Sequence, residues 1–167
     1  LGVQLWLNLP AKDKMAPPAY HSIKKSEIEE VEFDWGKIRL LAGQFEGRKG
    51  YMSKYLPLNY YDLHLNPNAS VLLNTESERA VMEFTLLGDA YIGGDLVKEK
   101  TAVRLTSGDY VNIKTTDKKA QVLFISSISL NEPISWGGPI VMNTKEELNK
   151  AFDDLRKGTF IQKTISY

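Results

Sequence analysis

The sequence predicts an all-β protein with one C-terminal helix, its strands arranged as a double-sheet jelly-roll barrel. Short segments with alternating apolar residues recur from the N-terminus to about residue 126. Clusters of glycine, proline, asparagine and aspartate separate these segments, with no helical periodicity between them. Many short strands with frequent turns are typical of a sandwich or barrel. Helical spacing of apolar residues is clear in a single segment near the C-terminus.

The first 33 residues are expected to hold two strands separated by a loop. Apolar side chains alternate along Gly2–Leu9, which predicts a strand. Pro10 ends this strand, because proline has no N–H to donate to a sheet. Residues 11–22 contain charged residues and a Pro-Pro pair, which favour a loop. Ser26–Phe33 could begin as a short helix, but its second half alternates, and a strand is favoured.

Seven further strands follow, each bounded by residues that favour turns. They are expected at Ile38–Ala42, Tyr60–Leu65, Ala80–Leu87, Ala90–Ile92, Thr101–Leu105, Tyr110–Ile113 and Ala120–Ser126. Asn66–Ala69 is expected to be a turn, with its proline at a position that suits a fixed φ. Gly93-Gly94-Asp95 lacks the glycine spacing and the lysine of a phosphate-binding loop, so a hairpin turn is predicted there.

The segment from residue 134 to residue 144 is predicted to carry the chain out of the sheet and start a helix. Gly137, Gly138 and Pro139 interrupt regular structure. Thr144 can cap the helix, and Glu147 can accept a hydrogen bond from the Thr144 backbone N–H, which together form a capping box.

The helix itself is expected over Lys145–Lys157. Leu148, Ala151, Phe152 and Leu155 follow the i, i+3, i+4, i+7 spacing of a single apolar stripe. Acidic residues occupy the first turn and basic residues the last turn, as the helix dipole favours. A glycine follows the last turn, where a left-handed C-terminal cap is common.

Composition excludes several classes of function. Lys plus Arg and Asp plus Glu both number 21, so the net charge is zero and no general attraction to nucleic acid is expected. The chain has no cysteine, which excludes disulfides and thiolate sites and fits a cytoplasmic protein. No apolar run approaches the roughly 18 residues that a membrane span requires, and no signal peptide is predicted. The chain starts with Leu1 and not with methionine, so we expect an expressed segment, a processed product or a fragment, and these three origins stay open.

Motifs at both ends of the chain resemble those of the pirin family. Trp136–Thr144, followed by Glu146-Glu147, resembles the Gly-Pro run that precedes the last helix of pirins. Gly2–Pro10, with Lys14-Met15 and Pro18–Tyr20, resembles the passage from the first to the second pirin cupin domain. The two motifs stand in the expected order and enclose nearly the whole chain. The resemblance therefore covers the second half of a full-length pirin.

The resemblance implies a cupin-type double-stranded β-helix with a helical appendix. Residues 1–143 would form the C-terminal cupin barrel, residues 1–10 being a linking strand, and residues 144–167 the helix and tail. Pirins are two-domain cupins whose N-terminal domain holds iron or a similar metal through histidines and a glutamate. Some members oxidise quercetin with dioxygen, and some are nuclear transcription cofactors. These metal ligands belong to a domain that this sequence does not include, so no catalytic or metal-binding residue is transferred and no cofactor is expected here.

The residues of this chain agree with that expectation. The first cupin metal motif would fall between Leu65 and Gly88, a region with no histidine. Its carboxylates, Glu76, Glu78 and Glu83, lack the imidazole partners of a non-haem iron site. The two histidines of the chain, His21 and His64, are interpreted as loop and rim residues. We therefore predict no catalytic site in this chain by itself.

A partner surface is predicted instead. In pirins the final helix packs against the first domain, so the equivalent apolar residues here would need another cover. The predicted interface residues are Ile140, Val141, Met142, Leu148, Ala151, Phe152 and Leu155. They are expected to pack on a second copy of the chain, on its own barrel, or on a separate metal-binding pirin-like cupin.

Three readings of the function remain open. The first is a metal-free cupin domain with a structural or regulatory interaction role. The second is the non-catalytic half of a pirin-type quercetin 2,3-dioxygenase, whose metal site lies in an N-terminal cupin domain. The third is a small-molecule binder that uses the barrel interior without a metal.

Overall fold

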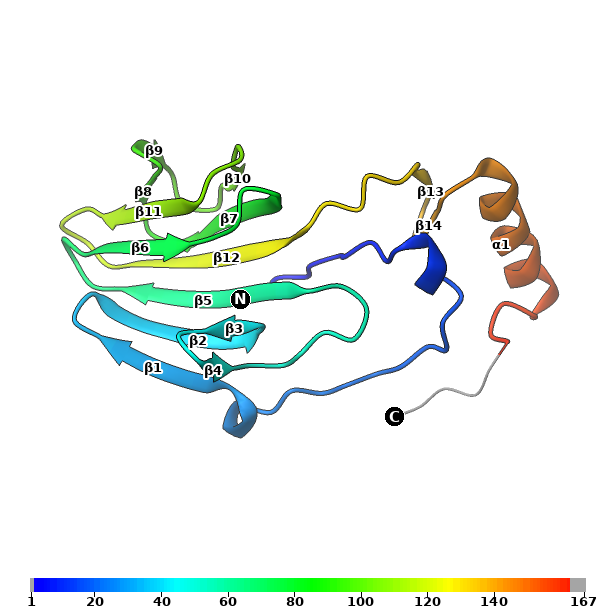
Figure 1. Cartoon of the computed structure of the whole chain (residues 1–167), viewed down its shortest axis with the longest axis horizontal. Coiled ribbons are helices and arrows are strands. Elements are labelled where there is room, and N and C mark those ends of the chain that lie inside the picture. Colours follow the sequence, from blue (N-terminus) through cyan, green and yellow to red (C-terminus); the bar gives the residue numbers. More distant parts are fainter. Residues whose placement is uncertain (1, 163–167) are drawn as a thin grey trace. The chain divides into compact units, whose positions relative to one another are not determined.

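The computed structural model describes residues 2–162 of the chain. Their contacts divide the chain into two compact units (Figure 1). One unit comprises residues 23–129 and holds the β-sandwich. The other combines the residues up to Ser22 with those from Leu130 onward. No helix among the described residues is long and apolar enough to cross a membrane.

The sandwich consists of two antiparallel sheets. The larger has the strand order β1-β2-β5-β12-β7-β10 and the smaller the order β6-β11-β8-β9. The strands of the larger sheet are β1 (Glu29–Phe33), β2 (Gly36–Ala42), β5 (Leu58–Leu65), β12 (Ala120–Ile128), β7 (Arg79–Leu87) and β10 (Ala102–Arg104). Those of the smaller sheet are β6 (Ser70–Asn74), β11 (Tyr110–Thr115), β8 (Ala90–Ile92) and β9 (Asp95–Val97). A one-turn 3-10 helix, η2 (Lys25–Glu27), precedes β1, and a short hairpin of β3 (Gln44–Phe45) and β4 (Arg48–Lys49) follows β2.

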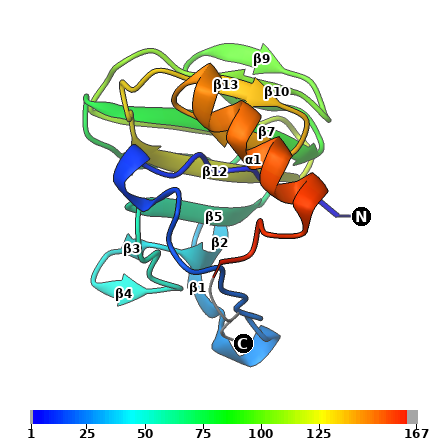
Figure 2. The same cartoon turned by 90° about the vertical axis from the view of Figure 1, so that its right-hand side faces the viewer.

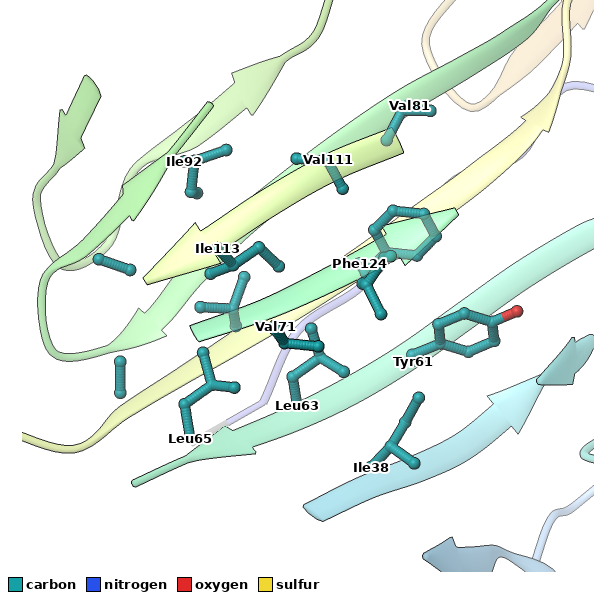
Figure 3. Close-up of a cluster of buried hydrophobic side chains, with 14 of the residues drawn as sticks. Ile38, Tyr61, Leu63, Leu65, Val71, Val81, Ile92, Val111, Ile113 and Phe124 are labelled. Carbon is teal, nitrogen blue, oxygen red and sulfur yellow. The ribbon is translucent and has the colours of Figure 1, made fainter. Parts of the chain in front are cut away.

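The core lies between the two sheets, because each sheet turns one set of alternating side chains inward (Figure 3). Ile38, Leu63 and Phe124 enter it from the larger sheet, and Val71 and Ile113 from the smaller. None of these five is more than 5% exposed. Burying side chains of this size contributes about 1.5–3 kcal/mol each relative to leaving them in water. The double-sheet fold predicted from the sequence is confirmed.

Aromatic side chains extend the core towards the β3–β4 hairpin. Tyr61 stacks on Phe124 with ring centroids 5.3 Å apart. Phe45 forms T-shaped pairs with Tyr61 and with Phe33, with ring centroids 5.8 Å and 5.9 Å apart. Phe33 in turn stacks on Trp35 at 4.8 Å. Offset and edge-to-face pairs of this kind are worth about 0.5–1.5 kcal/mol beyond the area they bury, so the row helps to fix the short hairpin on the sandwich.

The second unit contains the segment that was predicted to leave the sheet. Part of it forms a hairpin of β13 (Ser135–Gly137) and β14 (Ile140–Met142), which the sequence did not predict. The helix α1 (Lys145–Lys157) follows and packs beside this hairpin (Figure 2). The Glu147 N–H donates to Thr144 Oγ1 at 3.1 Å, and the Thr144 N–H donates to Glu147 Oε2 at 3.0 Å. Gly158 caps the C-terminus with φ of 71°. The helix and both caps are as predicted.

Other local predictions are confirmed or corrected by strand pairing. Gly93 and Gly94 form a two-residue hairpin turn between β8 and β9, with φ of 60° and 103°. The strand predicted for Gly2–Leu9 is wrong, since no described residue of that segment pairs in a sheet. Alternating apolar residues indicate only that one side of a segment can be buried. A strand also requires a neighbouring strand with free N–H and C=O groups, and this segment has none among the described residues. A single 3-10 turn, η1 (Ala11–Asp13), follows Pro10.

The boundaries of the two compact units differ from the predicted domain boundary. The predicted boundary fell at residue 143, before the helix. In the structure, residues from Leu130 onward belong with the helix, because the β13–β14 hairpin packs on it. The assignment of residues 1–143 to one cupin barrel and of residues 144–167 to a helix and tail stays a prediction, and residues 163–167 of that tail lie outside the described residues.

Candidate functional site

Polar groups gather on the inner face of the larger sheet, towards the end where β7 begins. Arg79, Val81 and Glu83 alternate along β7 and so share one face. In the sheet register Glu83 lies opposite Phe124, and Val81 lies opposite Ser126. Both Phe124 and Val81 belong to the core cluster, so Glu83 and Ser126 also project into the sandwich. The sequence placed Glu83 on a strand but did not indicate which face it occupies.

Glu83 is the most unusual group of this set. Its side chain is 0% exposed, and neither carboxylate oxygen has a hydrogen-bond partner among the described residues. Burial raises the pKa of Glu83 to about 8, because an ionised carboxylate would lose its hydration without gaining a partner. At neutral pH the side chain is therefore mainly the uncharged acid. Ser126, also 0% exposed, has a hydroxyl with no partner among the described residues.

Arg79 stands at the entrance to this inner face. Its Nη2 lies 3.1 Å from Glu76 Oε1, whereas Nε and Nη1 are buried without a partner among the described residues. The Arg79 side chain is 15% exposed and that of Glu76 is 66% exposed, so the ion pair spans the boundary with solvent. Arg79 lines a pocket of about 370 Å³ together with Gly43, Gln44, Asn59 and Glu76. Close by in sequence, the Thr75 hydroxyl is also buried and unpartnered within the described part of the chain.

Tyr61 is a polar group in the same interior whose hydroxyl has a hydrogen-bond partner. Its hydroxyl donates a hydrogen bond to the Gln44 carbonyl. Burial raises the pKa of Tyr61 to about 12, and the positive charge of Arg79 opposes this rise. The phenol is thus held in its neutral form and fixes the β3 segment to β5. Of these two buried groups, Glu83 is therefore the one whose pKa lies near neutral pH.

The carboxylates considered as metal ligands do not converge. Glu76 and Glu78 lie in the exposed loop between β6 and β7, whereas Glu83 lies inside the sandwich. Among residues 2–162, no group of three or more His, Cys, Asp or Glu side chains is placed to hold a metal ion. The sequence-based expectation that this chain binds no metal stays a prediction.

His64 occupies the outer face of the larger sheet and has a partner that the sequence did not reveal. Its Nε2 lies 3.1 Å from Asp62 Oδ2. Asp62 is 4% exposed and accepts hydrogen bonds from Arg39 Nη1 at 2.9 Å and Gln121 Nε2 at 2.7 Å. The three strands β2, β5 and β12 bring these residues together, although Asp62 and Gln121 are 59 positions apart. The buried carboxylate is satisfied by this network, which ties the strands together.

The predicted interface residues are partly covered by their own unit. Ile140 and Ala151 are buried, and Val141, Met142, Leu148 and Phe152 are half-buried. A Cβ atom at Gly137 would lie 3.0 Å from Phe152 Cε2 and 3.3 Å from Leu148 Cδ2. The absence of a side chain at this position therefore lets the helix approach the hairpin closely. Leu155, at the far end of the stripe, is 45% exposed.

More apolar surface lies beside this helix. Trp136 is 71% exposed and Ile134 is 68% exposed, and the Trp136 Nε1 donates to the Gly138 carbonyl at 2.7 Å. Lys14 holds the N-terminal segment to the hairpin, donating to Asn8 Oδ1 at 2.6 Å and to the Val141 carbonyl at 3.1 Å. Burial lowers the pKa of Lys14 against the opposing effect of nearby carboxylates. This unit is thus ordered by polar contacts and still presents large apolar side chains to solvent.

Comparison with known proteins identifies the class and then the family. The two facing antiparallel sheets are those of a cupin. The crystal structure of quercetin 2,3-dioxygenase from Acinetobacter baumannii superposes on this chain with a TM-score of 0.85 and 28% sequence identity. The match covers 93% of this chain and 55% of that chain. Residues 60–161 match the Pirin C-terminal cupin domain. Human Pirin is 34% identical over 93% of this chain and 55% of its own length. A Pirin-like protein of Caulobacter vibrioides is 32% identical over 95% of this chain and 58% of its own. The chain belongs to the pirin family, and it spans little more than half the length of these relatives.

Proposed function

We propose that this chain is a metal-free C-terminal cupin domain whose role is to pack against a partner and support or regulate it. The partner would be a second copy or a metal-binding pirin-like cupin. Any metal, iron by analogy with the family, would then be held by that other cupin. The lack of cysteine supports a cytoplasmic location for this assembly.

The observation that carries this proposal is the apolar surface of the unit that contains α1. Trp136, Ile134 and Leu155 are 71%, 68% and 45% exposed, and they lie on or beside the hairpin and helix. Large apolar side chains that are left in water favour association, because covering them removes apolar area from water. This chain covers only 55% and 58% of the length of human Pirin and of the Caulobacter vibrioides protein, which supports a cupin partner as the cover.

A second candidate is the non-catalytic half of a quercetin 2,3-dioxygenase. The likeness to the Acinetobacter baumannii enzyme, over 55% of that chain, favours it. In this reading the present chain would complete and orient a metal-binding cupin that performs the oxidation. The reading frame around the gene separates the two candidates, since an adjacent or in-frame metal-binding cupin would favour the second.

Association and metal content are the direct tests. We expect light scattering after gel filtration to give a dimer, or a complex when a metal-binding pirin-like cupin is added. Leu155→Glu should weaken that association at least tenfold, and Glu146→Gln, on the first turn of the same helix, should leave it unchanged. Plasma mass spectrometry should find metal far below one ion per chain. A monomer that ignores the added cupin, or one tightly held metal ion per chain, would contradict the proposal.

A further inference from the structure

The structure assigns a second site, inside the sandwich unit and independent of the interface proposed above. We infer that the pocket at the β7 end of the sandwich binds a small organic carboxylate, with Arg79 as its charged partner. The reasons are the unsatisfied donors of Arg79, the pocket that this residue lines, and the uncharged polar groups further along the same face.

The first reason is that Arg79 is only half satisfied. Guanidinium groups are rarely buried without acceptors, since each lost hydrogen bond to a charged donor is costly. Nη2 has Glu76, but the buried Nε and Nη1 have no acceptor among the described residues. An oxygen-bearing anion supplies the acceptors that these N–H groups lack, and charge-assisted bonds of this kind are the stronger ones.

The second reason is the shape and lining of the pocket. It encloses about 370 Å³, which suits a small ligand rather than a polymer. Apolar side chains from Met52, Pro57 and Leu58 form part of its wall, and Asn59 adds an amide. Arg79 is the one cationic residue among the described residues that line it. A single cation in a mixed polar and apolar lining favours a monoanionic carboxylate over a phosphate, which carries more negative charge, and the apolar part of the wall can cover a small apolar body.

The third reason is that the interior behind Arg79 is polar but uncharged. Along the inner face, the residue pair after Arg79 is Val81 with Ser126, and the next is Glu83 with Phe124. The Ser126 hydroxyl and the Glu83 carboxyl are both buried and have no partner in the described part of the chain. Because the Glu83 side chain is protonated at neutral pH, it does not repel an anion held at Arg79. Glu76 is the one competing carboxylate among the lining residues, and its exposed side chain can turn towards solvent when a ligand arrives.

The test uses benzoate as the probe and benzamide as its neutral match. We expect benzoate to shift the backbone amide signals of residues 43–44, 52–59 and 75–79 saturably in heteronuclear NMR spectra at pH 7. Benzamide should bind at least about tenfold more weakly, as loss of a charge-assisted contact implies. Inorganic phosphate should bind more weakly than benzoate, and tighter phosphate binding would refute the assignment to a carboxylate.

Three variants locate the site. Arg79→Gln should weaken benzoate binding at least about tenfold, whereas Arg48→Gln, which removes an exposed arginine paired with Glu29, should leave it unchanged. Glu76→Gln should tighten binding about threefold, because Arg79 loses its competing partner. Glu76 is exposed, so this variant remains informative even if Arg79→Gln does not fold. Equal binding of benzoate and benzamide, no saturable shifts, or an unchanged affinity in Glu76→Gln would overturn the proposal.

Discussion

Replacing Glu83 by glutamine should change how the stability of the sandwich depends on pH. The pKa of this side chain rises from 4.5 to about 8 on folding, because the buried carboxyl has no partner for its charged form. Between these two values the folded state keeps the proton and the unfolded state releases it. Unfolding therefore releases a proton, and the free energy of unfolding falls as the pH rises through this window.

The size of the effect follows from linkage. Each pH unit between the two pKa values costs about 1.4 kcal/mol, so the wild-type chain should lose about 3 kcal/mol of stability between pH 4.5 and pH 7 through this residue. The loss should level off above pH 8, at about 5 kcal/mol in total. Glutamine resembles the neutral acid in shape and does not titrate. We expect Glu83→Gln to match or fall below the wild type at pH 5 and to exceed it by several kcal/mol at pH 8.

Urea unfolding at pH 5, 6, 7 and 8, followed by tryptophan fluorescence, measures the difference directly. Other titrating groups affect both proteins alike, so the difference between the two curves isolates Glu83. Glu78→Gln, the same change on the exposed β6–β7 loop, is the matched control and should track the wild type. Parallel curves for wild type and Glu83→Gln across this range would refute the reasoning, since they would mean that Glu83 ionises freely in the folded state.

Three further predictions concern packing and caps. Phe124→Ala should lower the free energy of unfolding by about 3–5 kcal/mol in the same urea assay, because it opens a cavity beside Tyr61; a loss below 1 kcal/mol would contradict the core described here. Thr144→Ala removes the acceptor for the Glu147 N–H and should lower the stability of the first turn of α1 by about 1 kcal/mol. Amide hydrogen exchange in that turn should become roughly fivefold faster, while exchange in β5 stays unchanged. Gly137→Val would force Phe152 away from the hairpin, and exchange of the α1 amides should rise throughout the helix; protection equal to the wild type would show that the helix does not depend on this approach.

The sequence determined the elements whose signals are local. The helix, its capping box at Thr144 and its glycine cap are as predicted, because each depends on residues within one turn. The β8–β9 hairpin is also as predicted, since two consecutive glycines readily supply the positive φ values that a two-residue turn requires. Clean alternation likewise located β5 to within two residues at its start.

Elements whose signals depend on distant partners were decided by the tertiary structure. β6 was missed because Val71, Leu72 and Leu73 are all apolar, although only the first and third are buried. Gly2–Leu9 alternates but finds no strand to pair with. The β13–β14 hairpin was interpreted as a break, because its glycines were considered only as interruptions of regular structure.

In the candidate sites too, some features were set by the sequence locally and others only by contacts between distant strands. The sequence could establish which polar residues the chain has, but it could not show that Glu83 and Ser126 face the core while Asp62 meets Arg39 and His64 on the other side of the sheet. Which face of a strand is buried depends on the sheet packed against it, and the pKa of a carboxyl depends on whether that packing supplies a partner for its charge. Local geometry is set by neighbouring residues in the sequence, whereas burial and charge environment are set only when strands far apart in the chain come together.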